Sequence, residues 1–240
     1  MKRYGIIGNP LGHSYSEQYF TDLFAHLGLN ATYHPYAIAN IDQVTSLLTE
    51  LEGFNVTYPY KEAIIPYLCE MNNIAQAIGA VNVVYHGKGY NTDWIGFRES
   101  LRPLITGQQR ALLLGTGGVS KAIQHALDDI GIRYTLVSRG NSEKALCYNQ
   151  VDREVIKTHT IIVNCTPLGM HPYDNDFPNI PYEYLTKDHL LYDCIYNPDR
   201  TLFLQKGEQK GCRIKNGLEM LHLQADEAWK IWSNSSKLNI

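Results

Sequence analysis

Apolar and polar positions follow two alternating periods along most of the chain. Short apolar runs bounded by polar or glycine residues indicate strands, and longer segments with apolar residues every three to four positions indicate helices. The expected strands are Arg3–Ile7, Thr32–Ala37, Phe54–Thr57, Val81–Tyr85, Arg110–Leu114, Tyr134–Ser138, Thr160–Asn164 and Leu190–Cys194. The expected helices are Glu17–Leu27, Ile41–Leu51, Lys61–Leu68, Trp94–Leu101, Ser120–Ile130 and Thr201–Lys210. Strands alternating with helices favour an α/β fold with right-handed crossovers.

Two segments suggest how this pattern divides into domains. The stretch "PLITGQQ", residues 103–109, is polar, contains proline and glycine, and precedes the most apolar strand of the chain, so a domain boundary is expected there. After Gly217, the residues Leu218, Leu221, Ala225, Ala228 and Trp232 recur at helical spacing. A helix with such an apolar stripe must pack against another element. The turn "HGKGY" predicts that Val81–Tyr85 returns as a short hairpin.

Composition narrows the class of protein. The net charge of −3 argues against nucleic acid or an anionic membrane surface as the main partner. No apolar run has the length of a membrane span, and the first residues lack the apolar core of a signal peptide. The five scattered cysteines and nine histidines form neither a C-x-x-C pair nor a metal-ligand spacing. We therefore expect a cytoplasmic globular protein with reduced cysteines and no metal.

The stretch "RALLLGTGGVSKA" joins a buried strand, a glycine turn and a helix. Gly115 suits the tight turn, and Gly117 and Gly118 would let backbone approach a pyrophosphate at the N-terminus of the Ser120 helix. The third glycine of the usual pattern is absent, but strand before and helix after are the context that this motif requires. Dinucleotide binding is the favoured interpretation, and a glycine turn kept for packing is the alternative.

The next strand, "YTLVSRG", indicates which dinucleotide. An NAD-binding protein usually places an acidic residue at this strand end to hold the ribose 2′-hydroxyl. Here Ser138 and Arg139 stand there, and no acidic residue precedes Glu143. Arg139 can bind a 2′-phosphate through two hydrogen bonds, and Lys121 can add a second positive charge. The pattern favours NADP, with a solvated surface arginine as the alternative.

Four stretches in the first half carry polar groups at expected strand ends, and in an α/β sheet such ends converge on one crevice. Ser14 and Ser16 can donate two hydroxyls to a carboxylate, or cap the helix near Glu17. Lys61 follows Pro59, which must end the ladder of its strand, and the alternative is a solvated lysine. The remaining groups are Thr57, Asn82 and Asp93, and Asp93 could instead cap the Trp94 helix.

Eight motifs in order resemble the shikimate dehydrogenase family from Gly8 to about Ala225. They are "NPLGHSYS", "NVTYPYK", "GAVN", "NTDWIGF", "GTGGVSKA", "NCTPLGM", "DCIYNP" and "NGLEMLHLQA". The resemblance implies a substrate-binding and catalytic domain of open α/β type over residues 1–102. It also implies an NADP-binding Rossmann domain over 103–216 and a C-terminal helix, within 217–240, that returns to the first domain.

The resemblance also implies roles for individual residues. Lys61 and Asp93 would be the catalytic pair of an enzyme that interconverts 3-dehydroshikimate and shikimate with NADP, in aromatic amino acid biosynthesis. The residues expected to bind the substrate are Ser14, Ser16, Thr57, Asn82, Tyr196 and Gln224. Those expected to bind the cofactor are Gly115, Gly117, Gly118, Val119, Lys121, Ser138, Arg139, Thr166, Gly217 and Met220.

Some alternatives stay open at the level of sequence. The hairpin between Asn82 and Asn91 is shorter than is usual in the family, and Ser-Arg-Gly at 138–140 replaces the common Asn-Arg-Thr. A quinate or dual quinate/shikimate dehydrogenase would differ near the serine loop. A protein that senses NADP or a metabolite without turnover would usually have lost Lys61 or Asp93, and both are present. A homodimer is compatible with the sequence, which does not decide the oligomeric state.

Overall fold

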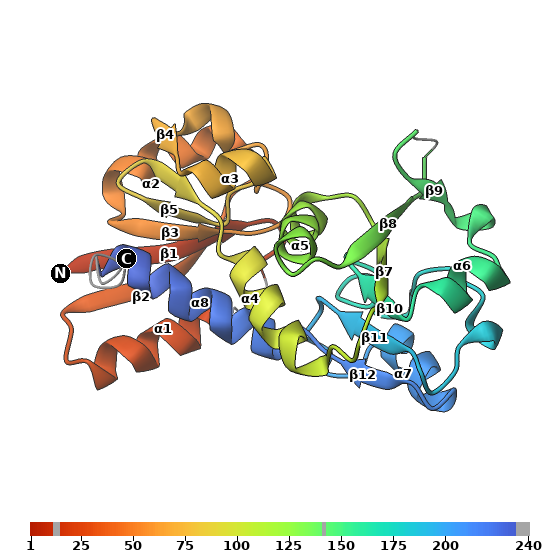
Figure 1. The fold of residues 1–240 in the computed structure, drawn as a ribbon. Coiled ribbons are helices and arrows are strands. Elements are labelled where there is room, and N and C mark those ends of the chain that lie inside the picture. The colour runs from red at the N-terminus through yellow and green to blue at the C-terminus, as the bar shows by residue number, and fades with distance from the viewer. Residues whose placement is uncertain (12–14, 141–142, 234–240) are drawn as a thin grey trace. The chain divides into compact units, whose positions relative to one another are not determined.

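A computed structural model describes residues 1–11, 15–140 and 143–233. The chain forms two compact units, the first made of Met1–Thr92 with Gln224–Ile240 and the second of Asp93–Leu223 (Figure 1). The division after Thr92 lies before the boundary expected at residue 103. It assigns helix α4, Asp93–Leu101, to the second unit, where α4 packs against α5, Gly118–Asp129. A polar loop marks where an element ends and does not reveal which neighbour that element packs against.

The first unit is built on a mixed sheet with the strand order β2-β1-β3-β5-β6-β4. The strands are β1 Lys2–Gly8, β2 Ala31–Ala37, β3 Gly53–Val56, β4 Glu70–Met71, β5 Val83–Tyr85 and β6 Lys88–Tyr90. Strands β1, β2 and β3 run parallel, whereas β5 runs antiparallel to β3 and pairs with β6 in the expected hairpin. The start of β5 and the end of β6 therefore lie at the same edge of the sheet.

The helices of the first unit are α1 Tyr15–His26, α2 Val44–Glu50, α3 Asn73–Ile78 and part of α8, Leu218–Trp232. The helix expected over Lys61–Leu68 is wrong: turns lead into a short 3₁₀ helix at Ile65–Tyr67. Pro66 explains the difference, since it lacks an N–H group and disfavours helical backbone in the residue before it. The helix expected from Ile41 likewise begins as a 3₁₀ turn, Ile41–Gln43, before α2.

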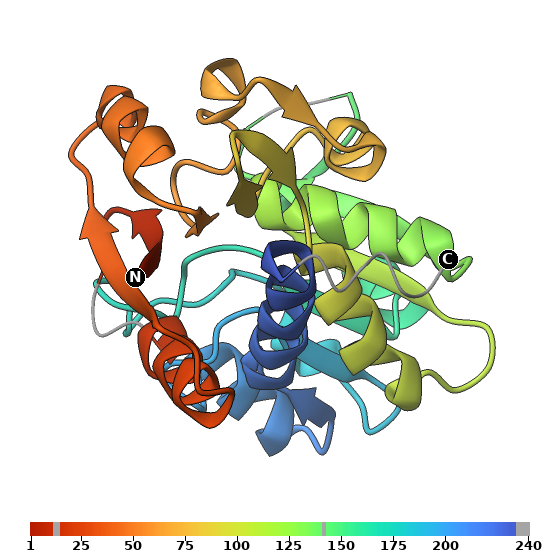
Figure 2. The same ribbon diagram turned by 90° about the vertical axis from the view of Figure 1, so that its left-hand side faces the viewer.

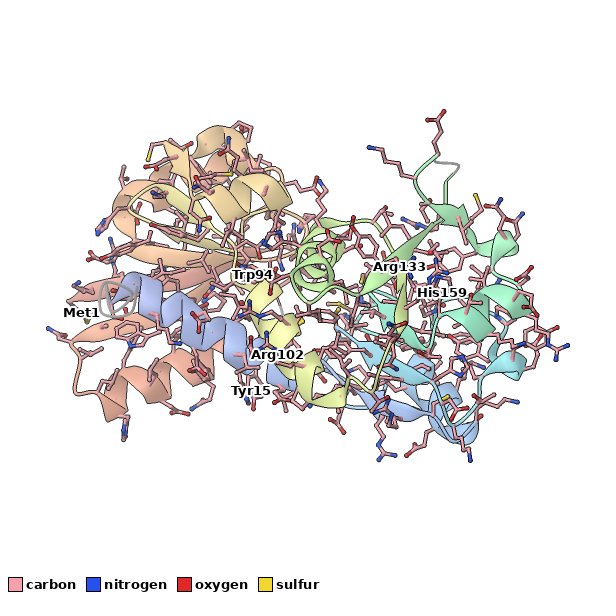
Figure 3. The ribbon with its side chains drawn as sticks, viewed as in Figure 1. Met1, Tyr15, Trp94, Arg102, Arg133 and His159 are labelled. Atoms are coloured by element: carbon pink, nitrogen blue, oxygen red, sulfur yellow. The ribbon has the colours of Figure 1, made fainter. Side chains whose placement is uncertain are left out.

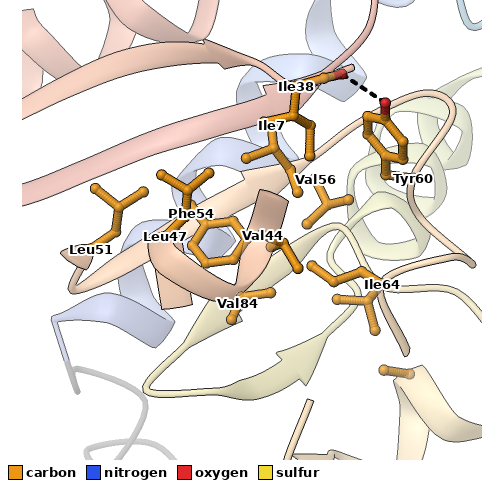
Figure 4. Close-up of a cluster of buried hydrophobic side chains, with 12 residues drawn as sticks. Ile7, Ile38, Val44, Leu47, Leu51, Phe54, Val56, Tyr60, Ile64 and Val84 are labelled. Atoms are coloured by element: carbon orange, nitrogen blue, oxygen red, sulfur yellow. Dashed lines mark hydrogen bonds between the residues drawn. The ribbon is translucent and has the colours of Figure 1, made fainter. Parts of the chain in front are cut away.

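Two apolar clusters hold this sheet from its two faces. One gathers Ile7, Phe54, Val56 and Ile64, and the Tyr60 hydroxyl at its margin donates to the carbonyl of Ile38 at 2.7 Å (Figure 4). The other contains aromatic residues of α1, β1 and β2 together with the end of α8. There, Trp232 is buried and its Nε1 donates to the carbonyl of Val84 at 3.0 Å. Figure 2 shows α1 and this end of α8 on the same side of the sheet, as the apolar stripe of the last helix requires.

The second unit contains an all-parallel sheet with the order β12-β11-β10-β7-β8-β9. Its strands are β7 Arg110–Leu114, β8 Arg133–Ser138, β9 Leu146–Cys147, β10 Ile161–Asn164, β11 Leu190–Asp193 and β12 Arg213–Lys215. Numbered along the unit, the order is 3-2-1-4-5-6, which is typical of dinucleotide-binding folds. The strand order reverses between β7 and β10, and ligands bind at such a point.

The helices of the second unit are α4, α5, α6 Arg153–Thr158 and α7 Leu202–Gln209, together with the first residues of α8. The pattern of apolar positions missed α6, β9 and β12, each six residues or shorter. Figure 3 labels Trp94 at the start of α4. Its ring lies under the guanidinium of Arg98 and packs edge-on against His125 of α5. Within the described part of the chain, the helices are all too short or too polar to cross a membrane.

Candidate active site

The glycine turn of the second unit lies at the point where the strand order reverses. The Gly115 N–H donates to Val137 of β8 at 2.8 Å, and the backbone of Gly115 has φ +110°, a conformation that glycine favours. A Cβ atom at Gly115 would lie 3.1 Å from the Thr166 methyl group, so the turn and the loop after β10 are in close contact. The sheet thus brings Gly115 and Thr166 together, as their expected shared role requires.

The N-terminus of α5 follows this turn directly. Gly117 is the N-cap residue of α5, and in the described structure no side chain of this residue makes a capping hydrogen bond. A Cβ atom at Gly117 would meet nothing within 4 Å among the described residues. The first N–H groups of a helix have no partner within the helix, so those of Gly118 and Val119 are available to an anion. The geometry fits a pyrophosphate.

The strand end after β8 carries the groups expected to choose between NADP and NAD. The Ser138 hydroxyl donates to the carbonyl of Gly140 at 2.6 Å, and Arg139 between them is exposed. Burial raises the pKa of Tyr148 to about 12, and the positive charge of Arg139 opposes this rise, which places Arg139 within electrostatic reach of Tyr148. Lys121 lies half-buried in the first turn of α5. Both cations therefore belong to the segments that follow β7 and β8.

Behind the glycine turn lies a buried polar network that the sequence did not reveal. Asp193, at the end of β11, is fully buried and accepts hydrogen bonds from Thr201 at 2.6 Å, from the Ile195 N–H at 3.0 Å and from Asn164 at 3.1 Å. Burial raises the pKa of Asp193 to about 7, against the effect of these three donors. The only signal in the sequence is an acidic residue that ends the apolar run "LLYD".

The first residues of α8 dock on the loop that follows β11. The Gly217 N–H donates to the carbonyl of Ile195 at 3.0 Å, and a Cβ atom at Gly217 would overlap the carbonyl of Cys194. Glycine is therefore required at this position because the two backbones approach closely. Tyr196 is half-buried in the same loop, and burial raises the pKa of its hydroxyl. Met220 is buried on α8.

In the first unit, hydrogen bonds connect Asn82 to Gln224 and to Thr92. Thr92 was not among the residues that the sequence predicted for the site. The Asn82 Nδ2 group donates to Thr92 Oγ1 at 3.0 Å and to Gln224 Oε1 at 2.9 Å, and Asn82 Oδ1 accepts from the Thr92 N–H at 2.7 Å. Asn82 and Thr92 are almost completely buried. Because a backbone N–H can only donate, the orientation of the Asn82 amide is fixed.

A second buried amide supports this cluster from inside the sheet. Asn55 of β3 accepts a hydrogen bond from the Tyr33 hydroxyl at 2.7 Å and donates to the carbonyl of Asn82 at 3.3 Å. The Val56 N–H donates to the same carbonyl at 2.9 Å. Buried amides keep their place only where they are hydrogen-bonded, so Asn55 fixes the backbone of Asn82 as Thr92 fixes its side chain.

The remaining expected residues lie near this edge or outside the described part. The carbonyl of half-buried Lys61 accepts from the Val81 N–H at 2.7 Å, which places the Lys61 backbone beside Asn82. Thr57 is half-buried, and its N–H donates to the carbonyl of Ile7 at 2.9 Å. Ser16 is buried inside the first turn of α1 and does not precede that helix as a cap would. Ser14 lies outside the described residues.

Asp93 is the first residue of α4 and is buried, with 4% of its surface exposed. It belongs to the helix, whereas the capping alternative would place it just before the first turn. Asp93 directly follows Thr92, whose hydroxyl and N–H are hydrogen-bonded to the Asn82 side chain. Among the described residues, no group of three or more histidine, cysteine or acidic side chains has the arrangement of a metal site.

A protein-family model and curated relatives match this chain. Residues 6–84 match the family model described as the shikimate dehydrogenase substrate binding domain. A curated relative from Carboxydothermus hydrogenoformans, named shikimate dehydrogenase (NADP(+)), is 37% identical, with 97% of this chain and 91% of the relative covered. The chain belongs to the shikimate dehydrogenase family.

Solved structures of shikimate dehydrogenases show the same fold. The crystal structure of the enzyme from Thermotoga maritima has a TM-score of 0.87 and 32% identity, with 96% of this chain and 93% of that chain covered. The enzyme from Thermus thermophilus, in complex with NADP(H) and shikimate, has a TM-score of 0.86 and 29% identity, with 98% and 94% covered. The two-domain α/β architecture, with its Rossmann part and returning helix, is therefore confirmed.

Proposed function

We propose that this protein is an NADP-dependent shikimate dehydrogenase, an oxidoreductase that interconverts 3-dehydroshikimate and shikimate in aromatic amino acid biosynthesis. One observation carries the proposal. A glycine turn at the switch point and a buried amide cluster at a strand edge occur together in a chain that matches NADP-dependent shikimate dehydrogenases over 97% of its length. Each part supplies half of what the reaction needs: cofactor binding and substrate recognition.

The second unit is the proposed cofactor domain. NADPH, when bound, supplies the hydride, and the protein supplies binding and orientation. The N–H groups around Gly117, Gly118 and Val119 would hold the pyrophosphate, with Gly115 allowing the close turn. Arg139 and Lys121 would hold the 2′-phosphate, since both are cationic and Glu143 is the first acidic residue after Arg139 in the sequence. Ser138, Thr166, Gly217 and Met220 would line the rest of the site.

The first unit is the proposed substrate domain. Ser14 and Ser16 would donate hydroxyls to the substrate carboxylate, and Thr57, Asn82 and Gln224, with Tyr196 of the second unit, would contact the ring and its hydroxyls. The orientation of the Gln224 amide follows from the cluster. Its Oε1 accepts from Asn82, so its Nε2 is the atom that would donate to a substrate oxygen.

Lys61 and Asp93 would handle the proton. Reduction of the ketone needs a proton on oxygen, and the ammonium group of Lys61 is a donor of the right kind. In the reverse direction Lys61 and Asp93 would accept the alcohol proton as a pair, and the shared proton belongs to the pair and not to one residue. A cytoplasmic location and a homodimer are further predictions, which cell fractionation and analytical ultracentrifugation test.

Absorbance of reduced nicotinamide tests the proposal directly. Purified protein is mixed with shikimate and NADP, then with NAD in place of NADP, and then with quinate in place of shikimate. Rapid reduction of NADP by shikimate alone is expected. Comparable rates with quinate or NAD would move the protein to the broader quinate/shikimate dehydrogenase group. Binding of NADP without reduction in any combination would favour a sensing protein and overturn the proposed activity.

A further inference from the structure

We infer that Asp193 is a positioning residue for the cofactor, because its carboxylate holds the loops after β10 and β11 in place against the glycine turn. The inference rests on the proposed function, since it assigns these loops to the NADP site. The hydrogen bonds of its carboxylate go to Asn164, Ile195 and Thr201, and Asp193 acts through these neighbours.

The first step is the burial and bonding of the carboxylate. Asp193 and Asn164 are fully buried, and Thr201 is 1% exposed. Oδ1 of Asp193 accepts from the Asn164 amide at 3.1 Å and from the Ile195 N–H at 3.0 Å, and Oδ2 accepts from the Thr201 hydroxyl at 2.6 Å. The Asn164 Nδ2 group and the Ile195 N–H can only donate, the Thr201 hydroxyl donates here, and an ionised carboxylate is an acceptor only. The donor set therefore fits the charged form and offsets part of the cost of burying it.

The second step leads from Asp193 to the loop after β10. Asn164 turns its Nδ2 group toward Asp193, which leaves its Oδ1 to accept from the Thr166 N–H at 3.0 Å and the Thr166 hydroxyl at 2.7 Å. Thr166 in turn packs its methyl group against Gly115. Asn164 Nδ2 also donates to the carbonyl of Leu168 at 3.1 Å, so Asp193 and that carbonyl together hold the amide in the orientation that binds Thr166 beside the glycine turn.

The third step leads to the loop after β11. Thr201 donates to Asp193 and packs against Gly169, where a Cβ atom would lie 3.0 Å from Thr201 carbons. Ile195, whose N–H also donates to Asp193, accepts from the Gly217 N–H with its carbonyl. One carboxylate therefore fixes both ends of the loop that carries Tyr196, and the start of α8 docks on the same loop.

Two variants with a matched control test the inference. Asp193→Asn keeps the shape but removes the charge and one acceptor oxygen, and the Asn164 amide and Ile195 N–H can only donate to the oxygen that remains. Thr201→Val removes one hydroxyl at constant shape, and Thr201→Ser restores it. Thr135→Val is the control, because the Thr135 hydroxyl is hydrogen-bonded to Nε2 of buried His159 at 2.8 Å and not to Asp193 or Asn164. The measurements are the Kd of NADP by calorimetry, the KM for NADP and for shikimate, and the melting temperature.

We expect Asp193→Asn and Thr201→Val to weaken NADP binding about tenfold or more, because a small displacement of a binding loop is costly. Thr201→Ser should bind NADP nearly as the wild type does, and Thr135→Val should lower the melting temperature without changing the Kd. Thr201→Val covers the case in which Asp193→Asn does not fold. A lower melting temperature with unchanged Kd and KM for NADP in Thr201→Val would overturn the inference and leave Asp193 a stabilising residue only. Because NADP binding is read without turnover, failure of the proposed activity would be seen separately, in the wild type.

Discussion

The two units differ in the kind of polar group at their strand ends, which is backbone N–H in the second unit and side-chain amide in the first. In the second unit, the strands of the described sheet run parallel, and the groups proposed to hold the cofactor are mainly backbone N–H groups around Gly115–Val119, supported from behind by the side chains of Asp193 and Asn164. In the first unit, antiparallel β5 and β6 bring Asn82 and Thr92 to one edge, and the groups proposed to bind the substrate there are side-chain amides. A site made of backbone depends on glycine and loop position, whereas a site made of side chains depends on single functional groups.

The largest effect is expected from a single functional group of the first unit. Lys61→Ala removes the proposed proton donor, and a general acid or base typically supplies about 10²–10⁴-fold in rate. We expect kcat to fall within that range while the Kd of NADP stays unchanged. Lys88→Ala is the control, since Lys88 pairs with Glu70 in the same unit at 2.7 Å. Normal turnover in Lys61→Ala would remove Lys61 from the mechanism.

The next effect tests how much one side chain of the second unit, Arg139, contributes to NADP affinity beside the backbone of the glycine turn. Arg139→Gln removes the charge proposed for the 2′-phosphate, and a hydrogen bond to a charged group contributes about 1.5–3 kcal/mol, roughly 10- to 150-fold in affinity. NADP affinity should fall by that factor and NAD affinity should not. Arg133→Gln, at the other end of β8, should change neither. An equal loss for NADP and NAD would contradict the role given to Arg139.

Backbone dependence of the second unit is tested at its glycine turn. Gly115→Ala puts a Cβ at φ +110° beside Thr166, and such backbone costs an L-residue about 1–2 kcal/mol. We expect NADP affinity to fall about tenfold. Gly211→Ala, at φ +76° with open space around its Cβ, introduces strain without touching the turn. Equal NADP affinity in both variants would show that the turn tolerates a side chain.

A smaller effect is expected from the amide cluster. Thr92→Val removes the hydroxyl that accepts from Asn82, and a neutral hydrogen bond contributes about 1 kcal/mol, or roughly fivefold in an equilibrium constant. The KM for shikimate should rise by about that factor at constant Kd for NADP. Thr45→Val makes the same substitution on the exposed surface of this unit and should change neither constant. A change in NADP binding alone would contradict the assignment of this cluster to the substrate.

The smallest effect concerns stability and not ligands. Burial lowers the pKa of His159 below 6.5, and the charge of Arg110 adds to this, against the backbone bond to Val155. The fold therefore favours neutral His159, and its contribution is complete above pH 6.5 and lost as the pH falls below that value. Urea unfolding at about pH 7.5 and about pH 5.5, on either side of the ordinary histidine pKa, measures this effect. The wild type should lose more stability between the two pH values than His159→Gln. Exposed His171→Gln should behave like the wild type.

Much of the second unit could be predicted from local sequence. The strand, glycine turn and helix around Gly115 are contiguous, so their geometry follows from the conformational freedom of glycine and from helix termini. Arg139, with no acidic residue before Glu143 in the sequence, likewise indicated NADP from a short stretch of sequence. In the first unit, the order of motifs indicated individual residues such as Lys61, whereas the pattern of apolar positions predicted a helix over Lys61–Leu68 that Pro66 does not allow.

The sequence by itself determined the strand-turn-helix unit, the alternation of α and β elements and the family. Only the tertiary structure decided that Thr92 and Gln224 fix the amide of Asn82, and that Asp193 joins two loops behind the glycine turn. The reason is that these contacts link residues far apart in the chain, such as Asn82 and Gln224, and depend on which strands are neighbours and in which register. Periodicity records which face of an element is buried, but a hydrogen bond depends on the element that lies opposite.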